Sequence, residues 1–248
     1  MNAGSEDAPD VQCIANKQRA LSVPFGSLDT TGQHHHRVVD SVSCPLEVSF
    51  LPPVASPANG GRLGLTVCPG KHILARDGTL FCRDLAADLT RLREVHGVDV
   101  VVALLPEAEL RYLKVRDYAS AVAAHRMEYL HLPIIEMAAP SDLHQAAALI
   151  DMVVERINAG KTVVLHCKGG VGRAGVIAAC TLLRLHVCTS PRDAIATVRK
   201  YRRGAVESRR QEEFVSTYSR LCSNPAAAWV QQSLADIAAG NGPNVPVR

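Results

Sequence analysis

The stretch that decides the fold runs from residue 163 to residue 175 and reads Val-Val-Leu-His-Cys-Lys-Gly-Gly-Val-Gly-Arg-Ala-Gly. The apolar run at 162–165 predicts a buried strand, and a nearly all-apolar helix is expected over 176–187. Backbone N–H groups of the glycine-rich turn between them can converge on one point, and the helix start adds about half a positive charge. The sequence therefore predicts an anion-binding site between the strand and the helix.

Outward from this stretch, helical and extended patterns alternate. Further strands are expected at 62–67, 98–105 and 129–132. Helices are expected after Asp84, from about Asp142 to Gly160, and after Ser190, where an N-cap residue or a C-terminal glycine marks an end. This alternation is typical of an α/β fold in which a central, mainly parallel sheet is flanked by helices.

Composition sets the boundaries of the folded part and excludes several classes of protein. Of the 248 residues 47% are hydrophobic, yet no apolar run approaches the roughly 20 residues of a membrane span. We expect a flexible N-terminal arm at 1–45, one domain at 46–222, and a tail at 223–248 in which one short helix could form. A net charge of +3 with few aromatic residues does not favour nucleic acid as a partner.

The first ten residues and the cysteines predict a cytoplasmic protein. The first ten residues carry three acidic side chains and no Lys or Arg, so neither a signal peptide nor a mitochondrial presequence fits. The eight cysteines stand apart with no CxxC pair, so we expect reduced thiols and no metal site.

A dinucleotide-binding loop is the first alternative for the glycine-rich turn. Gly170, Gly172 and Gly175 match the pattern G-x-G-x-x-G. That fingerprint needs a second parallel strand ending in an acidic residue roughly 20 positions on, whereas residues 191–202 predict another helix. The glycines alone are therefore weak evidence for a nucleotide.

Cys167 and Arg173 favour a different chemistry. A cysteine among inward-pointing N–H groups at a helix start is expected to have its pKa lowered from about 8.5, which makes it a thiolate nucleophile. Arg173 offers a planar, two-pronged donor for phosphate oxygens, and His166 could steady the loop through hydrogen bonds. These residues predict attack of Cys167 on a phosphate monoester, without a metal or cofactor.

The pattern His-Cys-x5-Arg after a buried strand resembles the cysteine-dependent protein tyrosine and dual-specificity phosphatases. Residues 61–71, 98–110 and 132–136 are similar to the cyclin-dependent kinase-associated phosphatase family, and residues 204–215 resemble the closing helices of dual-specificity phosphatases. The resemblance covers about residues 61–221. It implies a tyrosine-phosphatase-like fold for the domain at 46–222.

The resemblance also implies a role for single residues. Cys167 would be the nucleophile, and Arg173 with Lys168, Gly169, Gly170, Val171 and Gly172 would bind the phosphate. The family's general acid is an Asp; Glu136 occupies the matching position here, and we favour it over Asp142, which lies at a helix start where acidic residues are common.

Gln211 would position the hydrolytic water, or simply face solvent. Most family members carry Ser or Thr after the arginine, so Ala174 implies slow turnover.

The expected function is thus a phosphatase acting on phosphorylated proteins at Ser, Thr or Tyr, with a cyclin-dependent kinase phosphothreonine suggested as substrate. Two alternatives stay open: a phosphoinositide phosphatase, and a weakly active module that binds phosphoproteins. Six Lys or Arg between residues 199 and 210 either attract phosphorylated substrates or form a solvated helix end. Cys68, before a Pro-Gly turn, is either inert or a redox partner.

Overall fold

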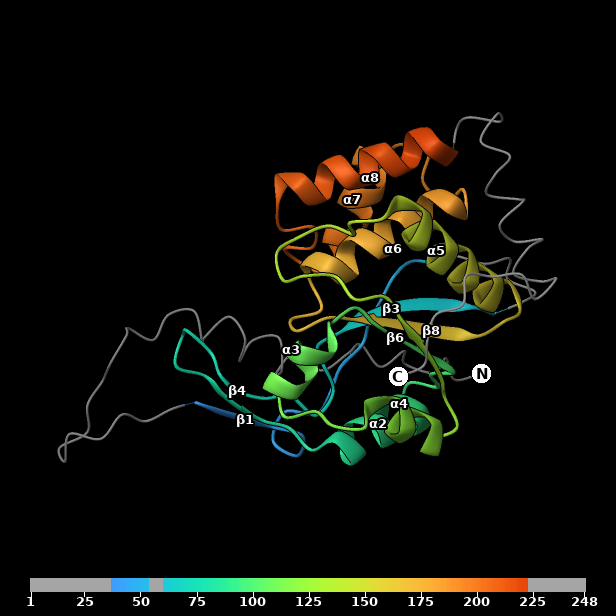
Figure 1. Ribbon diagram of the computed structural model, residues 1–248. Helices are drawn as coiled ribbons and strands as arrows, with labels where there is room; N and C mark the ends of the chain where they lie inside the picture. The colour runs from blue at the N-terminus through green and yellow to red at the C-terminus, as the bar shows by residue number, and fades with distance from the viewer. Residues whose placement is uncertain (1–36, 54–59, 223–248) are drawn as a thin grey trace, which may run out of the picture.

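A five-stranded sheet forms the centre of the molecule in the computed structural model, which describes residues 37–53 and 60–222 (Figure 1). The first pair of strands is antiparallel and the other three pairs are parallel, so the predicted mainly parallel sheet is confirmed. The strand order is β2 (Ser49–Phe50), β3 (Arg62–Thr66), β8 (Thr162–His166), β6 (Val100–Ala103) and β7 (Glu128–His131).

Helices cover both faces of this sheet, as the alternating pattern predicts (Figure 1). One face is covered by α5 (Leu143–Asn158) and α6 (Gly172–Arg184), and α7 (Pro191–Tyr201) and α8 (Arg209–Cys222) pack on the outer side of α6 (Figure 1). On the other side lie α2 (Leu85–Glu94) and α4 (Tyr118–Ala124), and α3 (Glu107–Tyr112) follows β6 at the end of the sheet. Within the described ranges no helix is both long and apolar enough to cross a bilayer.

Strand β8 lies in the middle of the sheet, and all five of its residues are buried. Leu165 is paired with Leu65 of β3 on one side and with Val102 of β6 on the other. Because all three strands are parallel, their carboxyl ends meet at one edge, which is where ligands bind in open α/β sheets. The segment that follows β8 therefore starts between the ends of two neighbouring strands.

A small second sheet was not expected from the sequence. It consists of β1 (Val38–Asp40), β5 (Leu80–Cys82) and β4 (His72–Leu74), with β1 parallel to β5. The sequence predicts a flexible arm up to residue 45, whereas β1 pairs with β5 and the turn after it bonds to Asp88 of α2, so residues 38–44 belong to the folded part. Residues 1–36 and the tail at 223–248 lie outside the described residues.

A buried ion pair ties the small sheet to α2. The Arg83 guanidinium donates to both carboxylate oxygens of Asp88 at 2.8 and 2.7 Å, and the two side chains are 3% and 1% exposed. Asp88 also accepts from Gly70 N and from the Ser41 hydroxyl, and Arg83 donates to Cys44 O. Four segments therefore meet at this buried pair of charges.

Helix ends largely follow the capping signals in the sequence. The Asp84 carboxylate caps α2 by accepting from Ala87 N, and the Ser190 hydroxyl caps α7. The exception is α6, which begins at Gly172 rather than at 176. Its first turn closes because Gly175 N donates to Val171 O, so the glycine-rich stretch itself becomes the helix start.

Candidate active site

The predicted nucleophile, Cys167, directly follows β8 and is 3% exposed. The segment from Cys167 to Arg173, here called the Cys167 loop, turns from the end of this central strand into α6. The structure thus brings a thiol, a run of glycines and a helix start to the edge where the parallel strands end. This is the arrangement that the sequence predicts.

The Cys167 loop turns four consecutive carbonyl groups outward, those of residues 168–171. Each of them accepts a hydrogen bond from a donor outside the loop or one turn further along α6. The donors are Cys68 N and Lys71 Nζ for Lys168 O, Arg202 for Gly169 O and Gly170 O, and Gly175 N and Val206 N for Val171 O. In a trans peptide the C=O and N–H groups point in opposite directions, and the described chain has no cis peptide. The N–H groups of residues 169–172 therefore face the inner side of the loop, where they can bind an anion.

Two of the loop glycines lie in close contact with their surroundings. Gly170 has a φ of +65°, and a Cβ there would lie 2.0 Å from Thr66 O at the end of β3. A Cβ on Gly172 would lie 2.1 Å from a carboxylate oxygen of Glu207. A side chain at residue 170 would push the loop away from the strand, whereas one at residue 172 would have to displace the flexible carboxylate of Glu207.

Arg173 lies in the first turn of α6, and its guanidinium is directed by two partners. Nη1 donates to Glu109 Oε2 at 2.6 Å and to Ile134 O at 2.8 Å, and Nη2 donates to Glu109 Oε1 at 2.8 Å. Arginine has five N–H donors, so these three bonds leave Nε–H and one Nη2–H, which lie on one edge of the plane. That edge suits two oxygens of a phosphate.

Glu109 is a site residue that the sequence analysis missed. It lies on α3, just after β6, and its side chain is 14% exposed. Glu109 is an acidic residue that follows shortly after β6, and β6 is a parallel neighbour of β8. Since the carboxyl ends of parallel strands meet at one edge of the sheet, this position is the signal that could have identified Glu109.

The two candidate general acids have different surroundings. The Glu136 carboxylate accepts from Lys168 Nζ at 2.9 Å, so it lies against the Cys167 loop. The Asp142 carboxylate instead accepts from the backbone N–H groups of His144 and Gln145, which makes it the N-cap of α5. The structure therefore brings Glu136 to the loop and assigns Asp142 a capping role.

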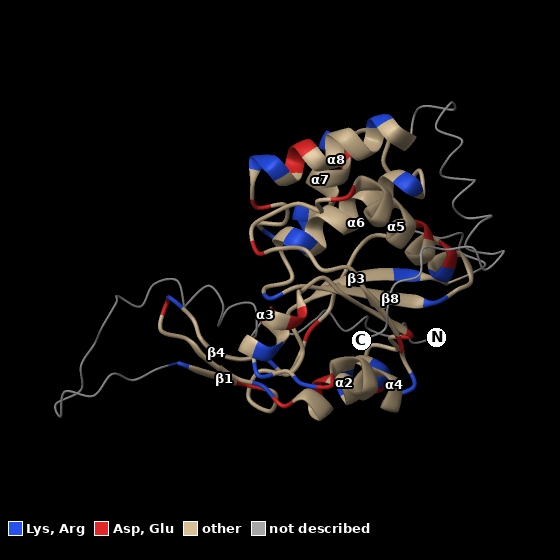
Figure 2. Ribbon diagram, viewed as in Figure 1, with Lys and Arg blue, Asp and Glu red and all other residues tan. Residues whose placement is uncertain are grey.

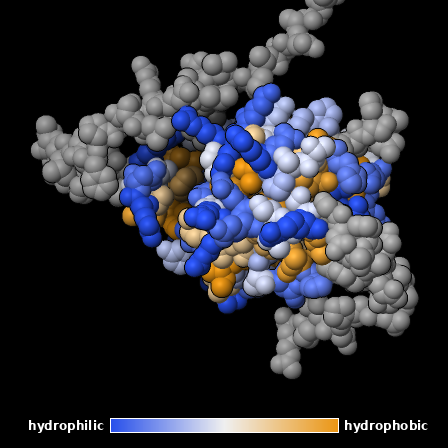
Figure 3. All heavy atoms as spheres, turned by 90° about the horizontal axis from the view of Figure 1, so that it is seen from above, coloured by the Kyte–Doolittle hydropathy of each residue, from blue (hydrophilic) through white to orange (hydrophobic). Residues whose placement is uncertain are grey.

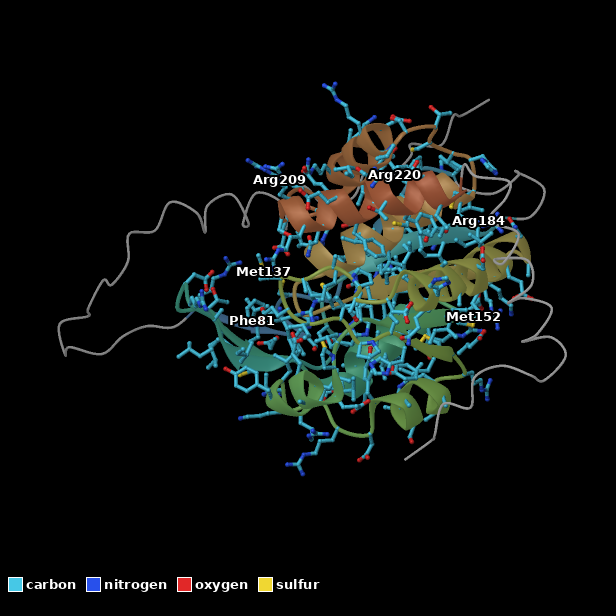
Figure 4. The ribbon with its side chains drawn as sticks, turned by 45° about the horizontal axis from the view of Figure 1, so that its top comes forward. Phe81, Met137, Met152, Arg184, Arg209 and Arg220 are labelled. Carbon is cyan, nitrogen blue, oxygen red and sulfur yellow. The ribbon has the colours of Figure 1, made fainter. Side chains whose placement is uncertain are left out.

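The turn that carries Glu136 is attached to its surroundings on both sides. Ile134 O accepts from Arg173, and Ala138 O accepts from Gln211 Nε2 at 3.1 Å. Met137, beside Glu136, lies toward the same side of the molecule as Phe81 of the small sheet (Figure 4). The turn of Glu136 is thus held to Arg173 of α6 and to Gln211 of α8.

Gln211 is fully buried rather than solvent-facing. Its amide oxygen accepts from Glu207 N at 2.8 Å while its amide nitrogen donates to Ala138 O. These bonds tie the start of α8 to the turn of Glu136. The Glu207 carboxylate lies over Gly172 next to the Gln211 amide, and the sequence analysis did not single it out.

His166 is buried beneath the Cys167 loop. Neither ring nitrogen has a partner of good hydrogen-bond geometry among the described residues, and only a weaker contact with the Cys167 backbone acts against the effect of burial on the ring. Its ring packs edge-on against Tyr118 with the centroids 5.3 Å apart. Burial lowers the pKa of His166 to about 3, which keeps the ring neutral.

Two more titratable groups lie behind the loop. Cys68 is fully buried, and burial raises the pKa of its thiol. Lys71 is 5% exposed with its ammonium 3.8 Å from the centre of the Phe81 ring, and burial lowers its pKa to about 8. Both cysteines, 68 and 167, are free thiols, so the redox role of Cys68 stays a prediction.

Comparison with known proteins matches residues 77–215 to the family model described as "Swiss Army Knife protein, DSP-PTPase phosphatase domain". The chain is 26% identical over 200 residues to cyclin-dependent kinase inhibitor 3 of Rattus norvegicus, covering 80% of this chain and 89% of that relative. It is 29% identical over 182 residues to the Homo sapiens protein of that name, covering 73% and 82%.

Solved structures share the fold. The kinase-associated phosphatase with its catalytic cysteine replaced by serine superposes with a TM-score of 0.62 at 22% identity, covering 72% of this chain and 97% of that one. The active form of Tk-PTP gives a TM-score of 0.52 at 28% identity, covering 64% and 92%. PTPMT1 in complex with PI(5)P gives 0.55 at 21% identity, covering 66% and 94%.

Proposed function

Since the chain belongs to the DSP-PTPase phosphatase family, and so carries a protein phosphatase domain, we propose that it dephosphorylates proteins through a covalent intermediate on Cys167. The observation that carries this proposal is the outward turn of the four carbonyls at 168–171. It leaves four N–H groups facing the inner side of the loop that also holds the Cys167 thiol. Phosphate oxygens would bind there without a metal ion.

In the first step the Cys167 sulfur, as a thiolate, attacks phosphorus. The S–P bond forms while the P–O bond to the substrate breaks, and Glu136 gives its proton to the leaving oxygen. The free edge of Arg173 and the loop N–H groups bind the three other oxygens, so the developing charge meets fixed donors. To act as the acid, Glu136 has to carry a proton and give up its ion pair with Lys168. The arriving phosphate dianion would attract the Lys168 ammonium and so replace Glu136 as its partner.

In the second step a water oxygen attacks phosphorus and the S–P bond breaks. The Cys167 thiolate is restored, inorganic phosphate leaves, and the Glu136 carboxylate takes the proton of the water. Ala174 has no hydroxyl to assist departure of the thiolate, so we propose that this step is slow and that the phosphoenzyme accumulates. Gln211 acts here through the turn of Glu136, which it holds by its bond to Ala138 O.

The proposed substrate is a phosphorylated protein, with a cyclin-dependent kinase as the first candidate. The support for the kinase is the name of the relatives, cyclin-dependent kinase inhibitor 3. A cytoplasmic location belongs to the proposal as well, because the seven cysteines in the described part of the chain are all free thiols. Lipid phosphate remains the alternative substrate, since Lys168 at the mouth of the loop would also suit an inositol headgroup.

The experiment measures phosphate release by the intact protein, Cys167→Ser and Arg173→Lys from a panel of phosphopeptides and a panel of phosphoinositides. We expect release from phosphopeptides by the intact protein and none by Cys167→Ser, while Arg173→Lys is strongly impaired because lysine lacks the two-pronged donor. Release that survives in Cys167→Ser would exclude the covalent mechanism. Preference for the lipid panel, or binding without release, would favour the lipid phosphatase or the binding module.

The general acid is tested by a matched pair of variants, Glu136→Gln and Asp142→Asn. We expect Glu136→Gln to lower release from a phosphothreonine peptide by about 100-fold or more, since its alkoxide needs a proton. Asp142→Asn should leave the rate within about twofold, because Asn is an equally good helix cap. Equal losses in the two variants would contradict the assignment of Glu136.

A further inference from the structure

Arg202 lies at the C-terminal end of α7, behind the Cys167 loop as seen from the phosphate side. Its Nη2 donates to Gly169 O at 2.9 Å and its Nε donates to Gly170 O at 3.0 Å. A third donor, Nη1, reaches the Ser49 hydroxyl on β2 at 3.3 Å. One side chain therefore joins α7, the loop and the edge of the sheet.

The two carbonyl bonds fix two adjacent peptide planes at once. When Gly169 O points to Arg202, the N–H of Gly170 points the opposite way, and Gly170 O does the same for the N–H of Val171. Both glycines have wide conformational freedom, so these planes could otherwise rotate. Two donors on one rigid plane can hold two neighbouring carbonyls together, whereas a single ammonium on a flexible stem cannot.

The charge of Arg202 is not neutralised by a carboxylate within the described part of the chain. Arg199, one turn earlier on the same helix, donates to Glu212, whereas the Arg202 bonds end on carbonyl and hydroxyl oxygens. Burial lowers the pKa of Arg202, with attraction to Cys167 acting against it. An arginine nevertheless stays protonated, so a positive charge remains close to the loop.

We propose that Arg202 is a positioning residue of this phosphatase, which holds the peptides after Gly169 and Gly170 so that their N–H groups bind the substrate phosphate. The inference rests on the proposed function, in which these N–H groups bind the transferred phosphoryl group. It assigns Arg202 no contact with the substrate. The guanidinium acts through the backbone, from the side of the loop opposite the phosphate.

The test compares Arg202→Gln and Arg202→Lys with two matched controls. Arg203→Gln removes an exposed arginine next in sequence, and Ser49→Ala removes the third partner of Arg202 without touching the loop. The readouts are the affinity for tungstate, an oxyanion that resembles phosphate, measured by calorimetry; kcat and KM on a phosphopeptide; and the thermal unfolding temperature.

We expect Arg202→Gln to weaken tungstate binding about 10-fold or more, as lost hydrogen bonds to a charged donor would cause. kcat should fall with it, because the same N–H groups bind the transition state, whereas both controls should stay within about twofold. Arg202→Lys should bind tungstate more tightly than Arg202→Gln does, because lysine restores the positive charge and can donate to one of the two carbonyls at a time. A purely structural role would lower the unfolding temperature of Arg202→Gln but leave tungstate affinity of the folded protein unchanged.

Tungstate binding by Arg202→Gln at the affinity of the intact protein would overturn the proposal. If Arg202→Gln does not fold, the folded Arg202→Lys variant decides, and unchanged tungstate affinity there is again a contradiction. Failure of the proposed function would give a different result. An intact protein that binds tungstate but releases no phosphate would contradict the proposed phosphatase activity, while the comparison of tungstate affinities would still test Arg202.

Discussion

At the scale of single residues, the candidate site depends on which donors of Arg173 are already in use. Glu109 and Ile134 O occupy three of them and thereby turn the remaining edge of the guanidinium toward the loop. The side chain is buried, so its rotation is restricted on all sides. Glu109, which takes two of these three hydrogen bonds, is therefore the side chain that sets the direction of Arg173.

We predict that Glu109→Gln lowers kcat/KM for para-nitrophenyl phosphate about 10-fold or more. The amide keeps one hydrogen bond but loses the two-pronged ion pair, and a charge-assisted hydrogen bond contributes about 1.5–3 kcal/mol. The control is Glu107→Gln, on the same helix but exposed, which should leave kcat/KM unchanged. Equal effects of the two variants would show that Glu109 does not direct Arg173.

The residues of the Cys167 loop are predictable from sequence because they are contiguous and their spacing reflects their chemistry. Glu109, Lys71 and Arg202 are not, because they reach the loop only through the strand order and the helix packing. Arg202 illustrates the difference. The sequence shows it as one of several basic residues near a helix end, yet its donors point to loop carbonyls 32 and 33 positions away.

Other basic residues of the 199–210 segment are also engaged with the protein itself. Arg199 donates to Ala205 O and Val206 O, and Arg209 pairs with Glu213. Basic and acidic positions stand next to each other along α8 (Figure 2), and the face that carries α7 and α8 is mostly hydrophilic (Figure 3). Part of this segment therefore stabilises the fold, and fewer of its basic side chains are left to attract a phosphorylated substrate.

At the scale of elements, the small sheet depends on polar contacts more than on an apolar core of its own. Its strands have three residues each, too few for a recognisable alternation, which is why sequence patterns did not predict it. Strands β3, β6, β7 and β8 of the central sheet have four or five residues each, and their positions were predicted to within a few residues, whereas the two-residue edge strand β2 was not predicted. The buried Arg83–Asp88 pair is what joins the small sheet to α2.

We predict that Asp88→Asn lowers the free energy of unfolding by about 3–5 kcal/mol, measured by urea denaturation. Removing one partner leaves a buried charge without compensation, which costs more than the pair contributes. The comparison is Arg209→Gln, which removes an exposed ion pair and should cost well under 1 kcal/mol. A small effect of Asp88→Asn would mean that the small sheet detaches without loss of the core.

At the scale of the whole molecule, the fold holds a neutral histidine directly before Cys167. His166 is fully buried at the end of the central strand, and burial lowers its pKa to about 3, compared with 6.5 for an exposed histidine. Between these two values the unfolded chain binds a proton that the folded chain does not. Stability therefore rises with pH in this window and is lost as the pH falls from 6.5 toward 3.

We predict that His166→Leu flattens this part of the pH profile of unfolding. For the intact protein the histidine alone should account for about 4 kcal/mol of lost stability by pH 3, because each unit of pKa shift corresponds to 1.36 kcal/mol. Urea denaturation of both proteins between pH 7 and pH 3.5 measures the difference. Parallel profiles would show that His166 takes up a proton in the folded state.

The position of β8 in the sheet has a consequence for biosynthesis. Strands β3 and β6 leave the ribosome well before β8, yet β8 lies between them, so the central sheet stays incomplete until residue 166 has emerged. The loop gains its outer support only after α7 and Arg202 follow. In a nascent chain Cys167 therefore emerges before the residues that support its loop from outside, and the anion-binding arrangement of the loop can form only after α7 has been made.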